Sequence, residues 1–430
     1  MNKKLQLYFL KIKKSELIKN SAVLIIGTVL AQLIPILLQP WLRRIYTPEE
    51  FGVFAIYTTL LGMVAAIASL KYDSTIVLPK HDKDATNLIA GSVLISIIIS
   101  FILLLVIIIF GDSIIHYFNF PDEIKKWTYF LPVGVFLFAN YQTFNYWLIR
   151  KRAYKISSIN KVIRRTAEGS TQLILGNITP SAGLIIGNIV GDFINLVSGG
   201  RQLIKTNFNR KLISFNRIFL VLKRYKEFPI YSALPAFFNS ISLTFPVLVV
   251  TKLFGEEITG QFNLSQMVLA LPLALVSISV YQVVFQQTSD LIKQNKSIYS
   301  IFKKTFTGLC ILSIPFMLIL YFFSEVLFTL IFGAQWELAG SISKILVFSY
   351  ALKFIVSPLS SVFTSLEKIK ISSIWQISYF VSILGLLWVD TDNISTFFYI
   401  YLLIDLIMYS IYLVLILIRV KKYEDSRFNN

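Results

Sequence analysis

The chain has 430 residues, of which 55% are hydrophobic and 15% are charged, and its mean hydropathy is +0.68. A soluble core of this size cannot bury so much apolar surface, so we expect the chain to use lipid as its solvent. The net charge of +18 would suggest a nucleic-acid partner in a soluble chain, but in a membrane protein it follows from topology. We therefore expect no nucleic-acid partner.

The long apolar runs cover about 20 residues each and do not alternate in strands of about ten, which predicts membrane-spanning helices and excludes a β-barrel. A hydropathy window of about 19 residues predicts about twelve helices, so the expected fold is an all-α polytopic membrane protein. The predicted helices of the first half are Ser21 to Leu42, Val53 to Val77, Leu88 to Phe110, Trp127 to Ile149, Ile156 to Ile178 and Ala182 to Gln202. Those of the second half are Tyr231 to Phe254, Gln261 to Phe285, Ile301 to Phe323, Ile342 to Ser365, Ile371 to Val389 and Ile394 to Ile418.

The basic residues predict the orientation of these helices. If the N-terminus is cytoplasmic, the basic residues of Lys3 to Lys19, Arg150 to Lys155, Arg201 to Lys226 and Arg419 to Arg427 all fall on the cytoplasmic side. The few on the opposite side are Arg43, Arg44, Lys125, Lys126 and Lys252. The positive-inside rule therefore predicts a multi-pass protein with both termini in the cytoplasm.

A short motif occurs once in each half of the chain. The first copy reads Ile34-Pro35-Ile36-Leu37-Leu38 and then Glu49-Glu50-Phe51-Gly52-Val53-Phe54; the second reads Phe245-Pro246-Val247-Leu248-Val249 and then Glu256-Glu257-Ile258-Thr259-Gly260-Gln261-Phe262. The repeat predicts an N-terminal six-helix bundle (1–203), a basic cytoplasmic linker (204–230) and a C-terminal six-helix bundle (231–430). Two such halves with the same orientation are typical of transporters that bind substrate near the bilayer midplane and work by alternating access.

Charged side chains inside the predicted helices are candidate substrate-binding residues. The fifth helix contains Lys161, Arg164, Arg165, Glu168 and Gln172, and at a rise of 1.5 Å per residue Arg165 lies roughly 14 Å deep. Because such charges are costly in lipid, they either line a water-filled cavity or form a structural pair of Arg164 or Arg165 with Glu168.

Further candidates lie in other helices. Asp192, Lys353 and Asp405 fall near the middle of their predicted spans, and Lys353 with Asp405 is either a functional site or a structural pair. Lys71, Tyr72 and Asp73 fall in the last turns of the second predicted helix. The predicted interior is thus rich in Lys and Arg, which suit an anionic phosphate attached to sugar because guanidinium binds phosphate oxygens in a bidentate manner.

The sequence contains no residues that indicate an enzyme or a metal centre. Cys310 lies in an apolar stretch, and His81 and His116 have no partner at metal-ligand spacing. We therefore predict no catalytic residues, no metal and no cofactor.

Two stretches resemble a known family. They are Ser69-Leu70-Lys71-Tyr72-Asp73-Ser74-Thr75-Ile76-Val77-Leu78-Pro79-Lys80 and the region with Trp147-Leu148-Ile149-Arg150-Lys151-Arg152-Ala153-Tyr154-Lys155, Gln172-Leu173-Ile174-Leu175-Gly176 and Gly183-Leu184-Ile185-Ile186-Gly187. Both resemble the polysaccharide biosynthesis flippases, the Wzx type of O-unit translocase. The resemblance is most specific from Ser21 to Leu203 and strengthens Lys71, Tyr72 and Asp73 as candidates.

The resemblance implies the multidrug/oligosaccharidyl-lipid/polysaccharide exporter fold, with two pseudo-symmetric six-helix bundles around a central cavity. It also implies that the substrate is an undecaprenyl-diphosphate-linked oligosaccharide, moved to the outer leaflet for O-antigen (lipopolysaccharide) or capsular polysaccharide assembly. The expected partners are this lipid-linked oligosaccharide, membrane lipid and a polysaccharide polymerase, and we expect a monomer.

Three other functions compete with this interpretation. A lipid II exporter of the same superfamily would bring additional spans, and a multidrug exporter would bring acidic residues into the first bundle. A membrane glycosyltransferase or polymerase needs a catalytic site, usually on a large outer loop, yet the longest outer connection is only Gly111 to Lys126. The cytoplasmic loop Thr206 to Ile230 has neither a Gly-rich phosphate loop nor an Asp-x-Asp pair.

Overall fold

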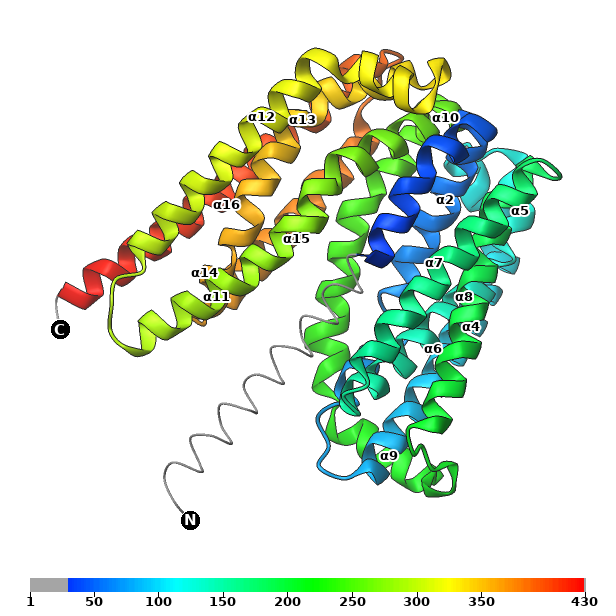
Figure 1. Ribbon diagram of the computed structural model, residues 1–430, viewed down its shortest axis with the longest axis vertical. Helices are drawn as coiled ribbons and strands as arrows, with labels where there is room; N and C mark the ends of the chain where they lie inside the picture. The colour runs from blue at the N-terminus through cyan, green and yellow to red at the C-terminus, as the bar shows by residue number, and fades with distance from the viewer. Residues whose placement is uncertain (1–29, 429–430) are drawn as a thin grey trace. The chain divides into compact units, whose positions relative to one another are not determined.

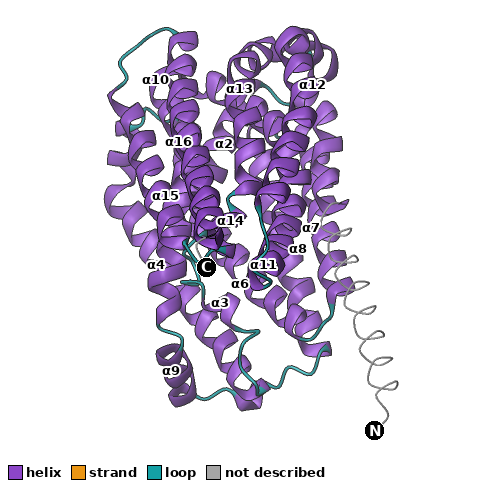
Figure 2. Cartoon of the chain, turned by 90° about the vertical axis from the view of Figure 1, so that its left-hand side faces the viewer, coloured by secondary structure: helices purple, strands orange, loops and turns teal. Residues whose placement is uncertain are grey.

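Our computed structural model describes residues 30–428, and all regular structure in that part of the chain is helical (Figure 2). Residues 30–45 form the first described helix, so the start of the predicted helix from Ser21 to Leu42 lies outside the described residues. The next helices are α2 (Pro48–Ala65), α3 (Tyr72–Thr75), α4 (Asp82–Tyr117), α5 (Asp122–Thr128), α6 (Leu131–Arg150), α7 (Tyr154–Gly176), α8 (Pro180–Lys205), the 3-10 turn η1 (Arg210–Leu212) and α9 (Phe215–Arg224).

The second half begins with a π-helical turn, η2 (Pro229–Ala233). It continues with α10 (Leu234–Pro272), η3 (Leu273–Ser277), α11 (Ile278–Lys293), α12 (Tyr299–Phe332), η4 (Ala334–Trp336), α13 (Glu337–Leu359), α14 (Ser361–Ser365), α15 (Ile369–Leu384), η5 (Gly385–Trp388) and α16 (Ile394–Phe428). Within α10 the backbone leaves the helical region at Gly255, where φ is 79°. Because this left-handed conformation favours glycine, Gly255 divides α10 into two helices.

Contacts between residues divide the chain into two compact units. The N-terminal unit comprises the described residues up to Tyr46, together with Tyr57–Tyr117 and Pro121–Phe237. The C-terminal unit comprises Thr47–Ile56, Phe118–Phe120 and the chain from Phe238 onward. Figure 1 shows α4, α6, α7 and α8 of the N-terminal unit running side by side.

Seven stretches of the described chain are long and apolar enough to cross a membrane, so this is a multi-pass membrane protein. They are Asp82–Tyr117, Ala182–Lys205, Pro229–Lys293, Tyr299–Phe332, Ala334–Ser365, Ile369–Trp388 and Ile394–Arg427. The stretch Pro229–Lys293 has 65 residues and contains two of the predicted spans, which meet near Gly255. α2, α6 and α7 are not among the seven, so the number of twelve spans stays a prediction.

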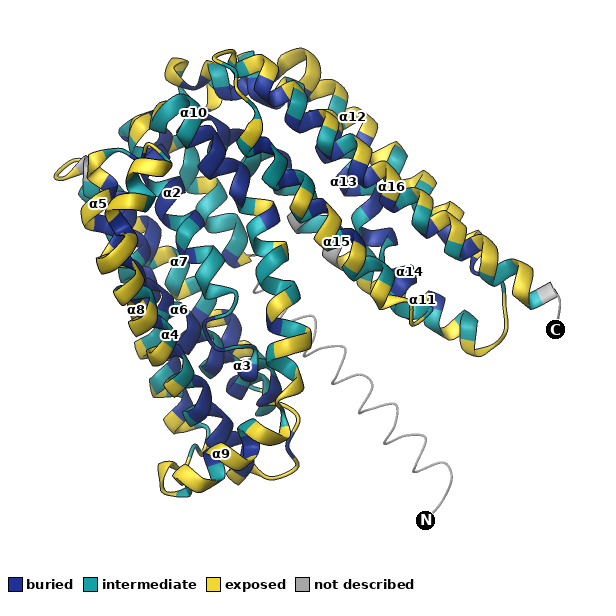
Figure 3. Cartoon of the chain, turned by 180° about the vertical axis from the view of Figure 1, so that it is seen from behind, coloured by how far each residue is buried: buried dark blue, intermediate teal, exposed yellow. Residues whose placement is uncertain are grey.

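The apolar side chains of the long helices are placed for contact with lipid. In α4, Ser92, Ser96 and Ser100 recur every four residues and are buried, whereas Phe101 and Ile109 are exposed. This pattern places small polar residues inside and large apolar residues outside, as expected of a helix packed in a membrane. Figure 3 shows exposed residues along the outer face of α12 as well.

The second predicted helix ends earlier than the sequence indicated. We predicted it to run from Val53 to Val77, but α2 ends at Ala65 and a series of turns follows before α3. Within these turns the backbone is left-handed at Leu70 (φ 49°) and Lys71 (φ 62°), so the segment does not continue as a helix to Val77. A hydropathy window cannot detect this because the segment remains apolar.

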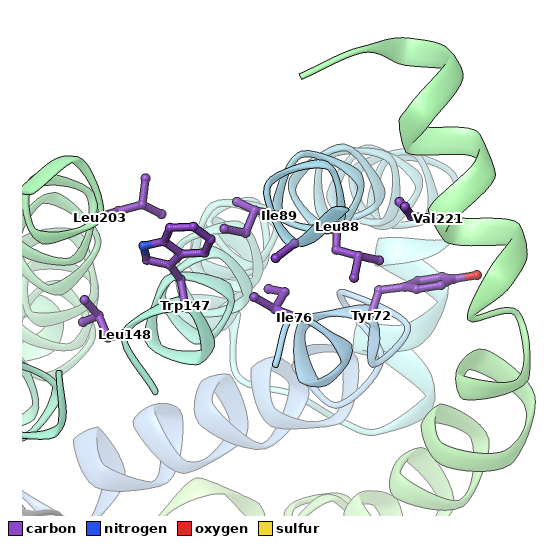
Figure 4. Close-up of a cluster of buried hydrophobic side chains, with 9 residues drawn as sticks. Tyr72, Ile76, Leu88, Ile89, Trp147, Leu148, Leu203 and Val221 are labelled. Atoms are coloured by element: carbon purple, nitrogen blue, oxygen red, sulfur yellow. The ribbon is translucent and has the colours of Figure 1, made fainter. Parts of the chain in front are cut away.

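A buried cluster holds the elements at one end of the N-terminal unit together (Figure 4). Its members come from α3, α4, α6, α8, α9 and the turn after α3, and they are Tyr72, Ile76, Ala85, Leu88, Ile89, Trp147, Leu148, Leu203 and Val221. Trp147 also donates its indole N–H to Oγ1 of Thr206 at 2.9 Å. The burial of each large apolar side chain stabilises the unit by about 1.5–3 kcal/mol.

The basic segment 204–230, which we expected to be a linker, is folded onto this unit. Arg217 of α9 forms an ion pair with Asp84 of α4 at 2.7 Å. The side-chain amide of Asn87 donates to the carbonyl of Leu212 at 2.9 Å and accepts from the backbone N–H of Ser214, also at 2.9 Å. These contacts attach the segment to the start of α4.

The two copies of the sequence repeat meet within the C-terminal unit. A Cβ added to Gly52 would lie 1.9 Å from the carbonyl oxygen of Glu256, and one added to Gly260 would lie 1.8 Å from the carbonyl oxygen of Pro48. The backbones therefore pack directly on each other, and only glycine fits at these two equivalent positions of the repeat.

Candidate functional site

A line of glycines on α8 determines how closely α7 can approach. Gly183, Gly187 and Gly191 recur every four residues and lie on the same face of the helix. A Cβ on Gly187 would lie 2.4 Å from Cγ of Gln172, and one on Gly191 would lie 2.9 Å from Cβ of Glu168. Small residues at this spacing let membrane helices pack backbone to backbone, so the polar residues of α7 are pressed against α8.

Two ion pairs form where α7 meets α8. Nε of Arg164 lies 2.5 Å from Oδ1 of Asp192, and this pair links the two helices. Arg165 forms a second pair within α7, with its Nη1 atom 2.7 Å from Oε2 of Glu168. The sequence left open whether these charges pair, and the geometry shows that both arginines do.

The carboxylates are more deeply buried than the arginines. The Asp192 side chain is 1% exposed and that of Glu168 is 9% exposed, whereas Arg165 is 33% exposed and Arg164 is 15% exposed. A buried carboxylate requires a partner because desolvation of an unpaired charge is costly. The arginine heads, by contrast, remain partly accessible.

Amide groups complete the cluster. Asn188 of α8 donates to Oε1 of Glu168 at 3.2 Å, and the Gln172 side chain donates to the carbonyl of Leu184 at 3.1 Å. Tyr46 donates its hydroxyl to the backbone carbonyl of Gln172 at 2.6 Å. Oδ2 of Asp192 has no hydrogen-bond partner within the described part of the chain.

The cluster therefore contains two arginines, two carboxylates and several amides, and Lys161 lies one turn earlier on α7. With Lys161 included, positive charges exceed negative charges by one. Guanidinium groups that bind carboxylates can exchange them for phosphate, because two oxygens of a phosphate can also accept from the planar guanidinium in a bidentate manner. Arg165 is the better placed of the two arginines because more of its side chain is exposed.

A second buried pair lies in the C-terminal unit. Nζ of Lys353 on α13 is 2.5 Å from Oδ2 of Asp405 on α16, and the hydroxyl of Tyr379 on α15 donates to Oδ1 of Asp405 at 2.8 Å. The ammonium also lies 4.8 Å from the ring centre of Tyr350 and 5.5 Å from that of Tyr401. The pair is 7% and 0% exposed, so the geometry is that of a satisfied structural contact that joins α13, α15 and α16.

Lys71, Tyr72 and Asp73 lie in and beside α3 of the N-terminal unit. Tyr72 belongs to the buried cluster of Figure 4 and donates its hydroxyl to the carbonyl of Leu222 at 3.1 Å. Asp73 accepts a hydrogen bond from Ser69 Oγ at 2.8 Å. Tyr72 and Asp73 thus make structural contacts within the N-terminal unit, and neither forms a hydrogen bond or ion pair with Arg164.

Several residues that shape the packing of these helices were not identified as candidates from the sequence. The Gly183–Gly187–Gly191 line carries a recognisable signal, because Gly-x-x-x-Gly in an apolar helix indicates close helix packing. Arg43, which we expected at the outer mouth, is only 1% exposed and accompanies Gln39, whose Oε1 accepts from its Nε at 3.0 Å. No pattern in the sequence indicated that burial. Among the described residues, no group of three or more His, Cys, Asp or Glu is placed to hold a metal ion.

Comparisons with known proteins give a consistent family assignment. The family model described as polysaccharide biosynthesis protein matches residues 41–340. The succinoglycan biosynthesis transport protein ExoT of Rhizobium meliloti (strain 1021) is 19% identical over 325 residues, which is 75% of this chain and 63% of that protein. The chain thus matches less than two thirds of the length of this relative.

Solved structures of membrane transporters have a similar fold. An inward-facing multidrug resistance MATE family transporter of the MOP superfamily is 13% identical, with a TM-score of 0.78 over 92% of this chain and 96% of that one. A MOP superfamily transporter from Pyrococcus furiosus, described as having a binding pocket of reverse polarity that suggests a different function, is 12% identical, with a TM-score of 0.59 over 95% and 96%. At these identities the likeness establishes the fold alone.

Proposed function

This chain belongs to the polysaccharide biosynthesis protein family, and from that premise we propose that it is a flippase for lipid-linked oligosaccharide. We propose that it moves an undecaprenyl-diphosphate-linked repeat unit from the cytoplasmic to the outer leaflet of the bacterial inner membrane. O-antigen or capsular polysaccharide would be the product of the pathway. The protein has no enzymatic role in this proposal, and both termini lie in the cytoplasm.

The observation that carries the proposal is the paired-arginine cluster between α7 and α8. A diphosphate headgroup presents anionic oxygens that a guanidinium fork recognises in a bidentate manner. Arg165 is 33% exposed while its partner Glu168 is 9% exposed, so an anion can reach the arginine. The amides of Asn188 and Gln172 add groups that hydrogen-bond to neutral hydroxyls such as those of a sugar.

The ion pairs also explain how such charges are tolerated inside a membrane protein. An unpaired arginine in the bilayer is costly, whereas Glu168 and Asp192 keep the cluster nearly neutral while it is empty. When a phosphate takes the place of the Glu168 carboxylate, Arg165 keeps an anionic partner, and Glu168 retains the hydrogen bond from Asn188. The carboxylates therefore hold the cluster ready for an anionic ligand.

The test is the surface polysaccharide of cells that express variants of Arg165. We expect Arg165→Ala to abolish export while the protein still inserts, since loss of a charge-assisted contact of about 1.5–3 kcal/mol lowers occupancy at least about tenfold. Arg165→Lys should retain part of the activity, because the charge remains and the bidentate fork is lost. Normal polysaccharide in the alanine variant would contradict the proposal.

A double variant separates ligand binding from structural pairing. If Arg165 serves only to neutralise Glu168, Arg165→Ala with Glu168→Ala should restore polysaccharide. If Arg165 binds the substrate, the double variant should remain inactive at normal protein level. Immunodetection of membrane fractions provides the control for insertion.

A further inference from the structure

A basic pocket lies in the C-terminal unit, well separated in sequence from the arginine cluster. It has a volume of about 330 Å³ and is formed by the turn between α14 and α15 together with the last turns of α16. The residues that line it are Leu366, Lys368, Arg419, Lys422, Tyr423 and Ser426. Half of this lining is cationic, and no carboxylate contributes to it.

The cations of the pocket lack counter-charges. Within residues 30–428, none of Lys368, Arg419 and Lys422 forms an ion pair with a carboxylate. Nε of Arg419 is buried and has no hydrogen-bond acceptor in that part of the chain. Since a buried donor without an acceptor is unfavourable, this N–H is available to an acceptor that enters the pocket, and the three cations favour an anionic one.

The carboxylate that lies nearest to Arg419 in the sequence, Glu424, has other hydrogen-bond partners. Glu424 of α16 accepts hydrogen bonds from the backbone N–H groups of Ile298 and Tyr299 at 2.8 and 3.2 Å. These are donors at the start of α12, where a carboxylate is favourable. Glu424 therefore anchors α12 and does not neutralise Arg419.

The position of Arg419 along α16 indicates which layer of the bilayer surrounds the pocket. Arg419 lies about 38 Å along α16 from Ile394, at 1.5 Å per residue from position 394 to position 419. The hydrocarbon core of a bilayer is about 30 Å thick and the whole bilayer about 40–45 Å. If α16 begins at one face of the core, Arg419 falls in the headgroup layer of the opposite leaflet, where lipid phosphates are concentrated.

We propose that this pocket binds the phosphate of an anionic membrane lipid. Arg419 would donate Nε–H to a phosphate oxygen, and Lys368 and Lys422 would balance its charge. Leu366 gives the pocket an apolar wall for the glycerol and acyl portion of the lipid. The proposal concerns the surrounding membrane and does not depend on which substrate is transported.

The test measures lipid binding by the purified full-length chain in neutral detergent, with bound lipid counted by native mass spectrometry. We expect phosphatidylglycerol to bind more tightly than zwitterionic phosphatidylcholine, because the choline group is repelled by the lysines. Arg419→Gln and Lys422→Gln should each weaken phosphatidylglycerol binding by about fivefold. Lys370→Gln removes an equal charge from α15 outside the pocket and should leave binding within about twofold.

Equal losses in Arg419→Gln, Lys422→Gln and Lys370→Gln would show that the attraction is general surface electrostatics and would overturn the proposal. Thermal unfolding of each variant shows whether the variant is folded. If Arg419→Gln is unstable, weaker phosphatidylglycerol binding by Lys422→Gln at unchanged stability still supports the site. Competition with inorganic phosphate at constant ionic strength distinguishes a lipid phosphate from free phosphate as the ligand of the pocket. We expect no displacement of lipid, and displacement at equal concentration would mean that the pocket takes free phosphate and that the lipid assignment is wrong.

Discussion

Arg164 and Arg165 are neighbours in sequence but have different roles at the scale of single residues. Arg164 crosses to Asp192 on α8, whereas Arg165 stays within α7 and pairs with Glu168. The difference follows from the helical repeat, because adjacent residues point about 100° apart. Arg164 therefore faces the neighbouring helix, and Arg165 lies where it remains partly exposed.

Removal of Arg164 should destabilise the protein more than removal of Arg165. In Arg164→Gln the Asp192 carboxylate, 1% exposed, loses its ion-pair partner, and we expect a loss of about 3–5 kcal/mol. In Arg165→Gln the loss should be smaller, because Glu168 retains the amide of Asn188. Thermal unfolding in one fixed detergent measures the stability loss of both variants.

The double variant Arg164→Gln with Asp192→Asn provides the control, since two neutral amides should recover most of the lost stability. If Arg164→Gln is as stable as the parent chain, the interhelical pair contributes little and Asp192 is neutralised in another way.

The sequence identified the charged residues of this cluster as candidates, but it did not indicate which residues would pair with each other. Arg164, Arg165 and Glu168 were candidates because they are charged residues within a predicted membrane span. The partner of Arg164 could not be predicted, because the pairing of α7 with α8 depends on the approach of two helices and not on spacing within one. The contacts of Tyr72 could not be predicted from the sequence either, because they depend on how α9 packs.

At the scale of elements, the packing of α7 on α8 depends on glycine. Gly187→Ala would place a Cβ 2.4 Å from Gln172 Cγ and 3.0 Å from the carbonyl oxygen of Glu168. The two helices must then separate, and we expect a loss of about 1–3 kcal/mol together with reduced export. Surface polysaccharide and thermal unfolding of the same variant measure the two effects.

Gly200→Ala is the matched control on the same helix. Its Cβ would lie 3.7 Å from Phe144 Cε2, an ordinary contact, and alanine is favoured over glycine in a helix by up to about 1 kcal/mol. This variant should be neutral or slightly more stable. A similar loss of stability in both variants would mean that the close approach at Gly187 is unimportant.

The helices themselves were largely predictable, and the exceptions have physical causes. Hydropathy identified the long apolar spans such as α4, α12 and α16, because lipid requires nothing more specific than apolar length. It missed the end of α2 at Ala65, after which turns with left-handed residues at Leu70 and Lys71 follow in a segment that is still largely apolar. It also missed α9, although Ile218 and Val221 are spaced to bury one face of a helix against α4.

At the scale of the whole molecule, the orientation in the membrane remains a prediction from charge. The basic residues of the segment 204–230 lie in α9 and the turns beside it, and the segment is attached to α4 through Arg217 and Asp84. Because positively charged segments are retained in the cytoplasm, this end of the N-terminal unit should be cytoplasmic.

Reporter fusions test this orientation directly. A fusion after Asn430 or within Thr206 to Phe228 should be active as a cytoplasmic reporter and inactive as alkaline phosphatase. A fusion in the connection between α15 and α16, near Asp390, should behave in the opposite manner. Alkaline phosphatase activity at Asn430 would refute the proposed orientation.

Two distant segments that carry the sequence repeat lie in contact within the C-terminal unit. Gly52 and Gly260 hold equivalent positions in the two copies, and each lies against the backbone of the other copy. The sequence could not predict that contact, because equal motifs need not touch. The two pseudo-symmetric six-helix bundles stay a prediction; the contact-based units meet between Phe237 and Phe238, apart from Thr47–Ile56 and Phe118–Phe120.

The central claim is that the protein moves a diphosphate-linked saccharide lipid that is bound through Arg165. The most direct measurement is the flipping of a polyprenyl-diphosphate-linked oligosaccharide with a labelled sugar in vesicles that contain the purified protein. The label is followed by its accessibility to an external quencher. We predict flipping that depends on the parent chain, falls at least about tenfold in Arg165→Ala and is partly retained in Arg165→Lys. Absence of protein-dependent flipping, or equal rates for the parent chain and Arg165→Ala, would contradict the account.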